Sequence, residues 1–231
     1  MSTSVILFDL IYTLLHLDME KFGLKVSMQF SASNEEIEAS DFLDSFKRNW
    51  ISYTDGEKIS KKEFYENVLG EVDISYSRDK AETVKNAFLD SFHIYDDADL
   101  LKELAERYRL GIITNGSEAL TTPLIKKFGF EEYFEVVINS REAGCRKPCK
   151  EIYTAVLNGF KVQPEEILFI SDEYEEDLLT AKEMGMKVCL IDRSGVVELE
   201  DAFKDLNEVE ELKSLGRLII KDLNELKKVI K

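Results

Sequence analysis

Five polar side chains of this 231-residue chain follow short apolar runs, and their types suit them to chemistry on a charged ligand. An ionised carboxylate can act as a nucleophile or hold a cation, a hydroxyl can donate a hydrogen bond to an anion, and a lysine can neutralise negative charge. Since the carboxyl ends of parallel strands meet at one edge of a sheet, we expect these side chains to converge there. They are Asp9, Thr114, Lys147, Asp172 and Asp177.

The elements that would position these residues alternate along the chain. Short apolar runs separated by helical patterns indicate βαβ units, which are almost always right-handed and place helices on both faces of a sheet. We therefore predict an α/β fold with a Rossmann-like parallel sheet. The predicted strands cover residues 4–8, 110–114, 134–138, 167–170 and 188–191, and the predicted helices cover 98–108, 120–128, 151–159 and 177–184.

The stretch 16–94 has a different pattern, because its apolar residues have helical spacing and no run matches the strands elsewhere. Asn34 and Ser60 are typical of helix starts, and Ser60 with Glu63 has the spacing of a capping box. We predict an all-helical insert after the first strand, so that 1–15 and 95–231 form the α/β unit. Near the C-terminus we expect a helix or loop at 201–215, a strand at 217–220 and a helix at 223–230.

Composition narrows the possible partners. A net charge of −16 and a pI of about 4.7 disfavour nucleic acid, which needs a basic face. The sequence has neither a membrane-spanning run nor a signal peptide, which favours a cytoplasmic protein. Three cysteines without framework spacing, Cys145, Cys149 and Cys189, are expected to be reduced thiols.

The polar sites resemble, in order and spacing, the four motifs of the haloacid dehalogenase-like (HAD) hydrolases. The run ending in Asp9 and continuing Leu-Ile-Tyr-Thr-Leu resembles the first motif, Asp-x-Asp-Gly-Thr-Leu. The run Ile-Ile-Thr114-Asn115-Gly116 resembles the second, and Lys147 followed by proline resembles the third. Asp172, followed five residues later by Asp177, resembles the fourth. The likeness covers about 1–15 and 95–192, and the helical insert lies where that family carries its cap.

The resemblance implies a phosphatase that acts on a small phosphorylated metabolite through an aspartyl-phosphate. Asp9 would be the nucleophile, with Thr114, Asn115, Gly116 and Lys147 holding the phosphate. Placing Asp172 beside Asp9 is unfavourable unless a cation lies between them, and oxygen ligands suit Mg²⁺. By resemblance the metal ligands would be Asp9, the carbonyl of Ile11 and Asp172, with Asp177 supporting Lys147.

One departure from the family pattern bears on activity. Ile11 stands where the family has its second Asp, the general acid, and Tyr12 stands where it has Gly. General acid–base help contributes about 10²–10⁴ in rate, so turnover would be weak or atypical. Two other interpretations stay open: a non-enzymatic binding protein on a degenerate HAD core, and a hydrolase similar to 2-haloacid dehalogenases, which also lack this Asp.

Overall fold

A parallel six-stranded sheet forms the centre of the protein, in a computed structural model that describes residues 2–56, 58–193, 219–228 and 230. The strand order is β5-β4-β1-β6-β7-β8, and all neighbouring pairs run parallel. This confirms the predicted Rossmann-like α/β fold. The strands are β1 (Val5–Phe8), β4 (Arg109–Thr114), β5 (Phe134–Asn139), β6 (Ile167–Ser171), β7 (Lys187–Ile191) and β8 (Ile219–Ile220).

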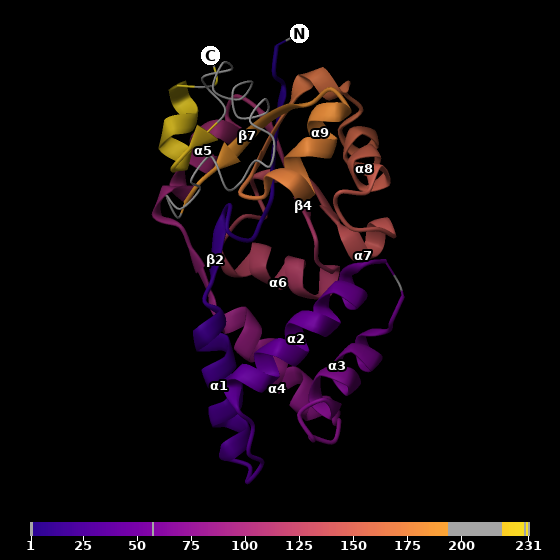
Figure 1. The fold of residues 1–231 in the computed structure, drawn as a ribbon. Helices are drawn as coiled ribbons and strands as arrows, with labels where there is room; N and C mark the ends of the chain where they lie inside the picture. The colour runs from indigo at the N-terminus through magenta and orange to yellow at the C-terminus, as the bar shows by residue number, and fades with distance from the viewer. Residues whose placement is uncertain (1, 57, 194–218, 229, 231) are drawn as a thin grey trace, which may run out of the picture.

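Both faces of the sheet are apolar, because side chains of each strand alternate between them. In β1, Ile6 and Phe8 join one buried cluster, while Val5 and Leu7 join another. The first cluster packs against α5 (Leu100–Ala105) and α6 (Glu118–Lys127), and the second against α8 (Lys150–Phe160) and α9 (Leu179–Glu183). Figure 1 shows α8 and α9 on the side of the sheet opposite α5.

Four helices of the described residues between 19 and 90 gather at one end of the molecule, below α6 in Figure 1. Their aromatic side chains, among them Phe22, Phe42 and Phe46, belong to the same apolar cluster as Phe8 of the sheet. The predicted helices of this segment are confirmed by the observed secondary structure. The helices are α1 (Met19–Ser31), α2 (Ala39–Thr54), α3 (Lys61–Gly70) and α4 (Arg78–Asp90).

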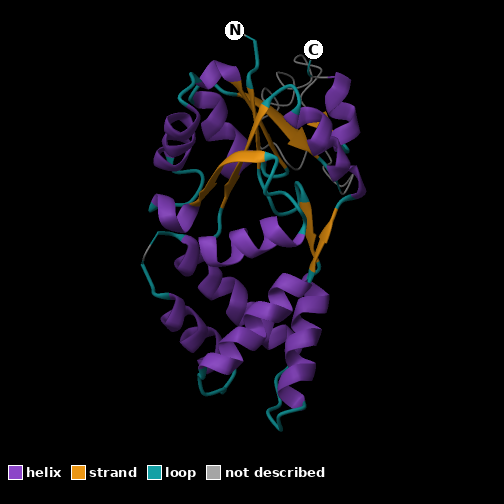
Figure 2. Cartoon of the chain, turned by 180° about the vertical axis from the view of Figure 1, so that it is seen from behind, coloured by secondary structure: helices purple, strands orange, loops and turns teal. Residues whose placement is uncertain are grey.

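The ends of the helical segment differ from the prediction. A short antiparallel ribbon of β2 (Leu15–Leu17) and β3 (Phe92–Ile94) connects it to the sheet (Figure 2). Three-residue strands are too short to give a readable alternation, so the expectation of no strand here was wrong. The capping box of Ser60 and Glu63 is confirmed, whereas Asn34 lies in a left-handed turn and α2 begins at Ala39.

Three other predicted helices contain 3₁₀ or π turns in place of regular α-helix. The helix predicted at 98–108 starts as a 3₁₀ turn, η1 (Asp96–Asp99), and the closing helix is 3₁₀, η4 (Leu223–Lys228). The segment expected to be helical from 177 opens with a π turn, η3 (Tyr174–Leu178). The helix or loop expected at 201–215, and part of the strand at 217–220, lie outside the described residues. No helix in the described part of the chain has the length and apolarity needed to cross a bilayer.

The close packing of α8 on the sheet leads to a stability prediction. A Cβ at Gly111 would lie 2.7 Å from ring atoms of Phe160 and 3.1 Å from the carbonyl oxygen of Val136. We expect Gly111→Ala to lower the free energy of unfolding by about 1–3 kcal/mol, measured by urea denaturation. The control is Gly70→Ala at the end of α3, where nothing lies within 4 Å, and which should be neutral or slightly stabilising. Equal effects of the two changes would contradict this account.

Candidate active site

The carboxyl ends of three central strands deliver polar residues to one cleft. Asp9 directly follows β1, and its N–H donates to the carbonyl of Ile170 at 2.9 Å, which extends the strand pairing by one residue. Thr114 ends β4, and Asp172 follows β6. The cleft has a volume of about 200 Å³. Its lining residues are Asp9, Ile11, Tyr12, Thr114, Asn115, Arg146, Lys147, Asp172, Glu173, Glu176 and Asp177.

Lys147 is the buried centre of this arrangement. Its Nζ donates to Asp9 Oδ1 at 2.5 Å, to Asp177 Oδ2 at 2.6 Å and to the carbonyl of Ile113 at 3.3 Å. Burial alone would lower the pKa of Lys147, but Asp177 and Asp9 outweigh it and raise the pKa above its ordinary value. Lys147 is therefore a fixed positive charge beside Asp9.

The side chain of Asn115 holds the backbone of Lys147. Asn115 Oδ1 accepts from the Lys147 N–H at 2.8 Å, and its Nδ2 donates to the Lys147 carbonyl at 3.3 Å. Gly116 follows, with its N–H donated to the carbonyl of Thr114 at 3.0 Å. Of the three residues from 114 to 116, Thr114 and Asn115 line the cleft. Asn115 thus positions Lys147, and this role does not follow from the sequence position of Asn115 or from its being an asparagine.

Two hydroxyl groups orient the remaining carboxylates. Thr13 Oγ1 donates to Asp172 Oδ1 at 3.1 Å, and Ser171 Oγ donates to Asp177 Oδ2 at 2.6 Å. Sequence reasoning assigned no role to Thr13 or Ser171, because the Thr13 contact joins residues 159 positions apart. Arg146, also missed, lines the cleft and donates to the side chain of Thr54 in α2. Its place beside Lys147 was the one signal that could have pointed to it.

The cleft carries more negative than positive charge. Burial, together with the charges of Asp177 and Asp172, raises the pKa of Asp9 to about 8, against the opposing effect of Lys147. Burial and the charge of Glu173 raise the pKa of Asp172 to about 7, although the hydrogen bond from Thr13 opposes this. Lys147 pairs with Asp9 and Asp177, and no described contact gives Asp172 a cation, so ionising all three acids is unfavourable without another cation.

Ile11 and Tyr12 form the turn after Asp9. Ile11 lines the cleft and packs on the apolar cluster of the sheet. Tyr12 has a φ of 64°, in the left-handed region that favours glycine. Burial, with the charges of Asp172 and Tyr95, raises the pKa of the Tyr12 phenol, so it stays protonated at neutral pH. Tyr12 and Asp172 also line a second cavity, of about 530 Å³, together with Arg193.

The cations of the helical segment lie away from the cleft lining. Lys25 pairs with Asp90, Arg48 with Glu71, and Lys58 with Asp55, all within that segment. One contact between the segment and the rest of the protein comes from Arg141 of α7 (Ser140–Ala143), whose Nη1 donates to the carbonyls of Tyr53, Gly56 and Ile59.

The cysteines differ from the prediction. Cys145 and Cys149 form a disulfide, with Cα atoms 6.2 Å apart, whereas Cys189 is free and buried. The expectation that all three are reduced thiols was therefore wrong for the first pair. A turn in which the Cys149 N–H donates to the carbonyl of Arg146 at 2.8 Å brings the two residues within bonding range. Sequence spacing alone does not show that turn.

Together, the parallel sheet and the acid-rich cleft at its carboxyl edge define a Rossmann-like α/β protein with a carboxylate–lysine site. The family model of haloacid dehalogenase-like hydrolases matches residues 6–191. The chain therefore belongs to the haloacid dehalogenase-like hydrolases.

Comparisons with known proteins agree with that family. The chain is 32% identical to glyceraldehyde 3-phosphate phosphatase of Pyrococcus furiosus over 46% of this chain and 44% of that protein, so the match spans less than half of the relative. Its fold is similar to that of BT-2542 of Bacteroides thetaiotaomicron, a HAD-family enzyme solved with magnesium and inorganic phosphate (TM-score 0.64, 22% identity, 90% of this chain and 99% of that one). It is also similar to L-2-haloacid dehalogenase of Xanthobacter autotrophicus (TM-score 0.69, 18% identity, 98% of each).

The raised pKa values of Asp9 and Asp172 give a prediction for stability. Unfolded aspartates titrate near pH 4, so between about pH 4 and pH 8 the folded state holds more protons than the unfolded state. The free energy of unfolding should therefore fall as the pH rises through this window, by at most about 1.4 kcal/mol per pH unit for each titrating group. Urea unfolding in EDTA at several pH values measures the slope. Asp172→Asn should flatten it, and stability that rises across the window would contradict the assignment.

Proposed function

We propose that this chain is a Mg²⁺-dependent phosphatase of small phosphomonoesters, with Asp9 as the nucleophile and with weak activity. The observation that carries the proposal is the contact of Lys147 with Asp9 at 2.5 Å, at the end of β1 and inside a cleft that Thr114 and Asp172 also line. A carboxylate, a buried cation and a hydroxyl donor in one cleft suit phosphoryl transfer, because they can supply a nucleophile and stabilise charge on the phosphoryl oxygens.

The donor set of the cleft fits a magnesium ion. Asp9 and Asp172 offer hard oxygen ligands, and their raised pKa values reflect negative charge that Lys147 does not balance. The hydrogen bonds of the described residues give the Ile11 carbonyl no donor, so its oxygen is also available. We assign Asp9, Asp172 and the Ile11 carbonyl as ligands. A magnesium ion bound there would supply positive charge to the phosphoryl oxygens.

The chain's own residues would carry the reaction in two steps. A carboxylate oxygen of Asp9 attacks phosphorus and the ester oxygen leaves as an oxyanion that takes a proton from solvent, which gives an aspartyl-phosphate. Water then attacks phosphorus, the bond between phosphorus and the Asp9 oxygen breaks, and phosphate, the Asp9 carboxylate and a proton to solvent are released. Lys147 keeps Asp9 oriented and stabilises charge on the transferred group, and the hydroxyl of Thr114 donates to a phosphoryl oxygen. Asp177 and Asn115 keep Lys147 in place through its amine and its backbone.

Protonation of the leaving oxygen is the weak step. Ile11 has no proton to give, and Tyr12 points its hydroxyl to the carbonyl of Leu17 at 3.5 Å. Esters whose leaving groups need no proton should therefore be the better substrates. This supports weak turnover of ordinary sugar or amino-acid phosphates and measurable turnover of activated aryl phosphates.

The helical segment 16–94 would act as the cap of the site, with 1–15 and 95–231 as the hydrolase core. Arg146 reaches Thr54 from the loop that carries Lys147, and Ser140 Oγ donates to the Thr54 carbonyl at 2.7 Å. These contacts hold the end of α2 beside the cleft, where a cap would select the leaving group. The names of the curated relatives support a small phosphorylated metabolite as substrate.

The central experiment measures p-nitrophenyl phosphate hydrolysis with added Mg²⁺. Asp9→Asn removes the nucleophile and should lower kcat by at least about 10³-fold, and EDTA should abolish turnover. The matched control is Asp44→Asn, an exposed aspartate of α2. Normal turnover by Asp9→Asn would overturn the proposal, as would chloride release from a 2-haloacid without metal and without ester hydrolysis.

A second experiment tests whether a missing acid is the cause of weak activity. Ile11→Asp restores a carboxyl group two residues after Asp9 and should raise kcat for alkyl phosphates by about 10²–10⁴. Ile11→Asn has the same shape without the acid and should give no such gain. If neither variant gains activity and the wild type binds no Mg²⁺ by calorimetry, the non-enzymatic interpretation holds instead.

A further inference from the structure

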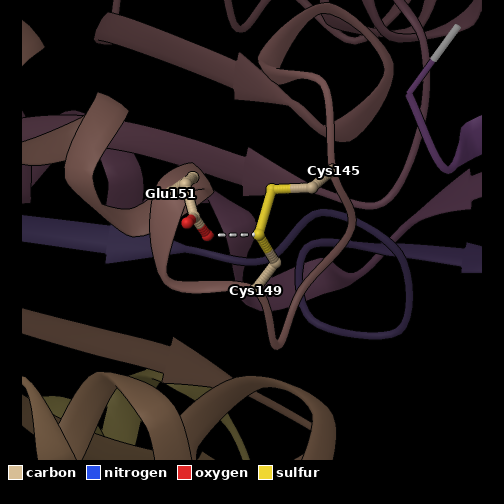
Figure 3. Close-up of side chains that lie close together, drawn as sticks. All are labelled: Cys145, Cys149 and Glu151. Atoms are coloured by element: carbon tan, nitrogen blue, oxygen red, sulfur yellow. Dashed lines mark hydrogen bonds between the residues drawn. A yellow bond between two sulfur atoms is a disulfide. The ribbon is translucent and has the colours of Figure 1, made fainter.

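The loop that carries Lys147 is closed into a covalent ring. Cys145 and Cys149 are joined by a disulfide across the segment Cys-Arg-Lys-Pro-Cys, and both are half-buried rather than enclosed in the core (Figure 3). Lys147 lies between the two cysteines in the sequence, and its amine donates hydrogen bonds to Asp9 and Asp177. A bond that solution thiols can reach therefore constrains the backbone of the lysine at the centre of the cleft.

A carboxylate lies against one sulfur of this pair. Glu151 Oε2 is 2.7 Å from Cys149 Sγ, and both lie at the start of α8 (Figure 3). In the disulfide that sulfur has no hydrogen, so two electron-rich atoms face each other. After reduction, the Cys149 thiol can donate a hydrogen bond to Glu151. Glu151 therefore favours the dithiol form, which makes the disulfide easier to reduce.

Other contacts of the loop do not depend on the disulfide. Asn115 binds the N–H and the carbonyl of Lys147, and the Cys149 N–H donates to the carbonyl of Arg146. These bonds would keep the loop folded after reduction, but with more freedom at Arg146 and Lys147. Opening the ring should therefore weaken the placement of the lysine without unfolding the site.

We propose that Cys145 and Cys149 are a reversible dithiol–disulfide site for low-molecular-weight thiols and disulfides, and that the disulfide form holds Lys147 for turnover. In oxidation, the Cys145 thiolate attacks a small disulfide RSSR, forms a mixed disulfide and releases RS⁻, which takes up the proton that Cys145 lost. The Cys149 thiolate then attacks Cys145 Sγ and releases the second RS⁻, which takes the proton of Cys149. Two cysteine thiols are oxidised and RSSR is reduced to two RSH.

The order of attack follows from Glu151. Glu151 lies 2.7 Å from Cys149 Sγ and farther from Cys145 Sγ, although within 4.8 Å of it, so the carboxylate repels a thiolate at Cys149 more strongly than one at Cys145. Cys145 is therefore the attacking residue and Cys149 the resolving one. The consequence for turnover rests on the proposed phosphatase function, but the exchange itself does not.

The experiment equilibrates the full chain in buffers of varied reduced-to-oxidised glutathione ratio. Intact mass follows the loss of two hydrogens, and p-nitrophenyl phosphate hydrolysis is measured in the same samples. We expect the disulfide form to turn over about threefold to tenfold faster. Cys189→Ser should keep this response, and Cys145→Ser/Cys149→Ser should show the low rate at every ratio. Glu151→Ala should form the disulfide at an oxidised-glutathione fraction about threefold to tenfold lower.

The outcomes separate this inference from the proposed function. Thiols that stay reduced in oxidised glutathione, or equal turnover by the two forms, would overturn the inference. If neither form hydrolyses phosphate esters, the proposed function fails, and amide hydrogen exchange then decides the inference. Slower exchange at the Lys147 N–H in the disulfide form supports the ring's effect on the loop, and equal exchange contradicts it.

Discussion

A buried lysine that needs two carboxylates sets the geometry of this protein. Removing Asp9 or Asp177 would leave Lys147 as a buried charge with too few partners, which would lower the free energy of unfolding by several kcal/mol. Asp9 comes from the end of β1, Asp177 from the turn after β6, and Lys147 from a loop after β5. The three segments must therefore meet at fixed positions. The sheet register places the ends of β1 and β6 side by side, Asn115 holds the backbone of Lys147, and the Ser171 hydroxyl orients Asp177.

The same constraint leaves the cleft short of positive charge. Asp172 is a third acid of the cleft, half-buried and close to Asp9, and its only described hydrogen-bond donor from another side chain is Thr13. Excess negative charge in a dry site raises pKa values and makes a bound cation favourable. The acids of the cleft therefore favour a small cation at this edge of the sheet, and the net charge of −16 of the whole chain acts in the same direction.

Most of the α/β fold was predictable from the sequence, because strands and helices follow the local spacing of apolar residues. Apolar runs that end in Asp9 and Thr114 mark strand ends, and a parallel sheet brings such ends together. The contacts that tune the site were not predictable, since Thr13 meets Asp172 across 159 residues and Asn115 meets a backbone 32 residues away. The ribbon of β2 and β3 was missed because its three-residue strands are too short to show alternation and pair across the whole helical segment. The Cys145–Cys149 bond was missed because it depends on a turn that sequence spacing does not show.

The apolar cluster that runs from Phe8 of the sheet into Phe22 and Phe46 of the helical segment has a consequence for evolution. Neighbouring aromatic rings in that segment lie close together, as Phe22 and Phe46 do with ring centroids 4.9 Å apart. A change of helix order or length there would alter packing on the sheet itself. Surface residues of α1–α4 can therefore change without disturbing this cluster, but replacing the whole segment requires matching changes in the side chains of the sheet beneath it.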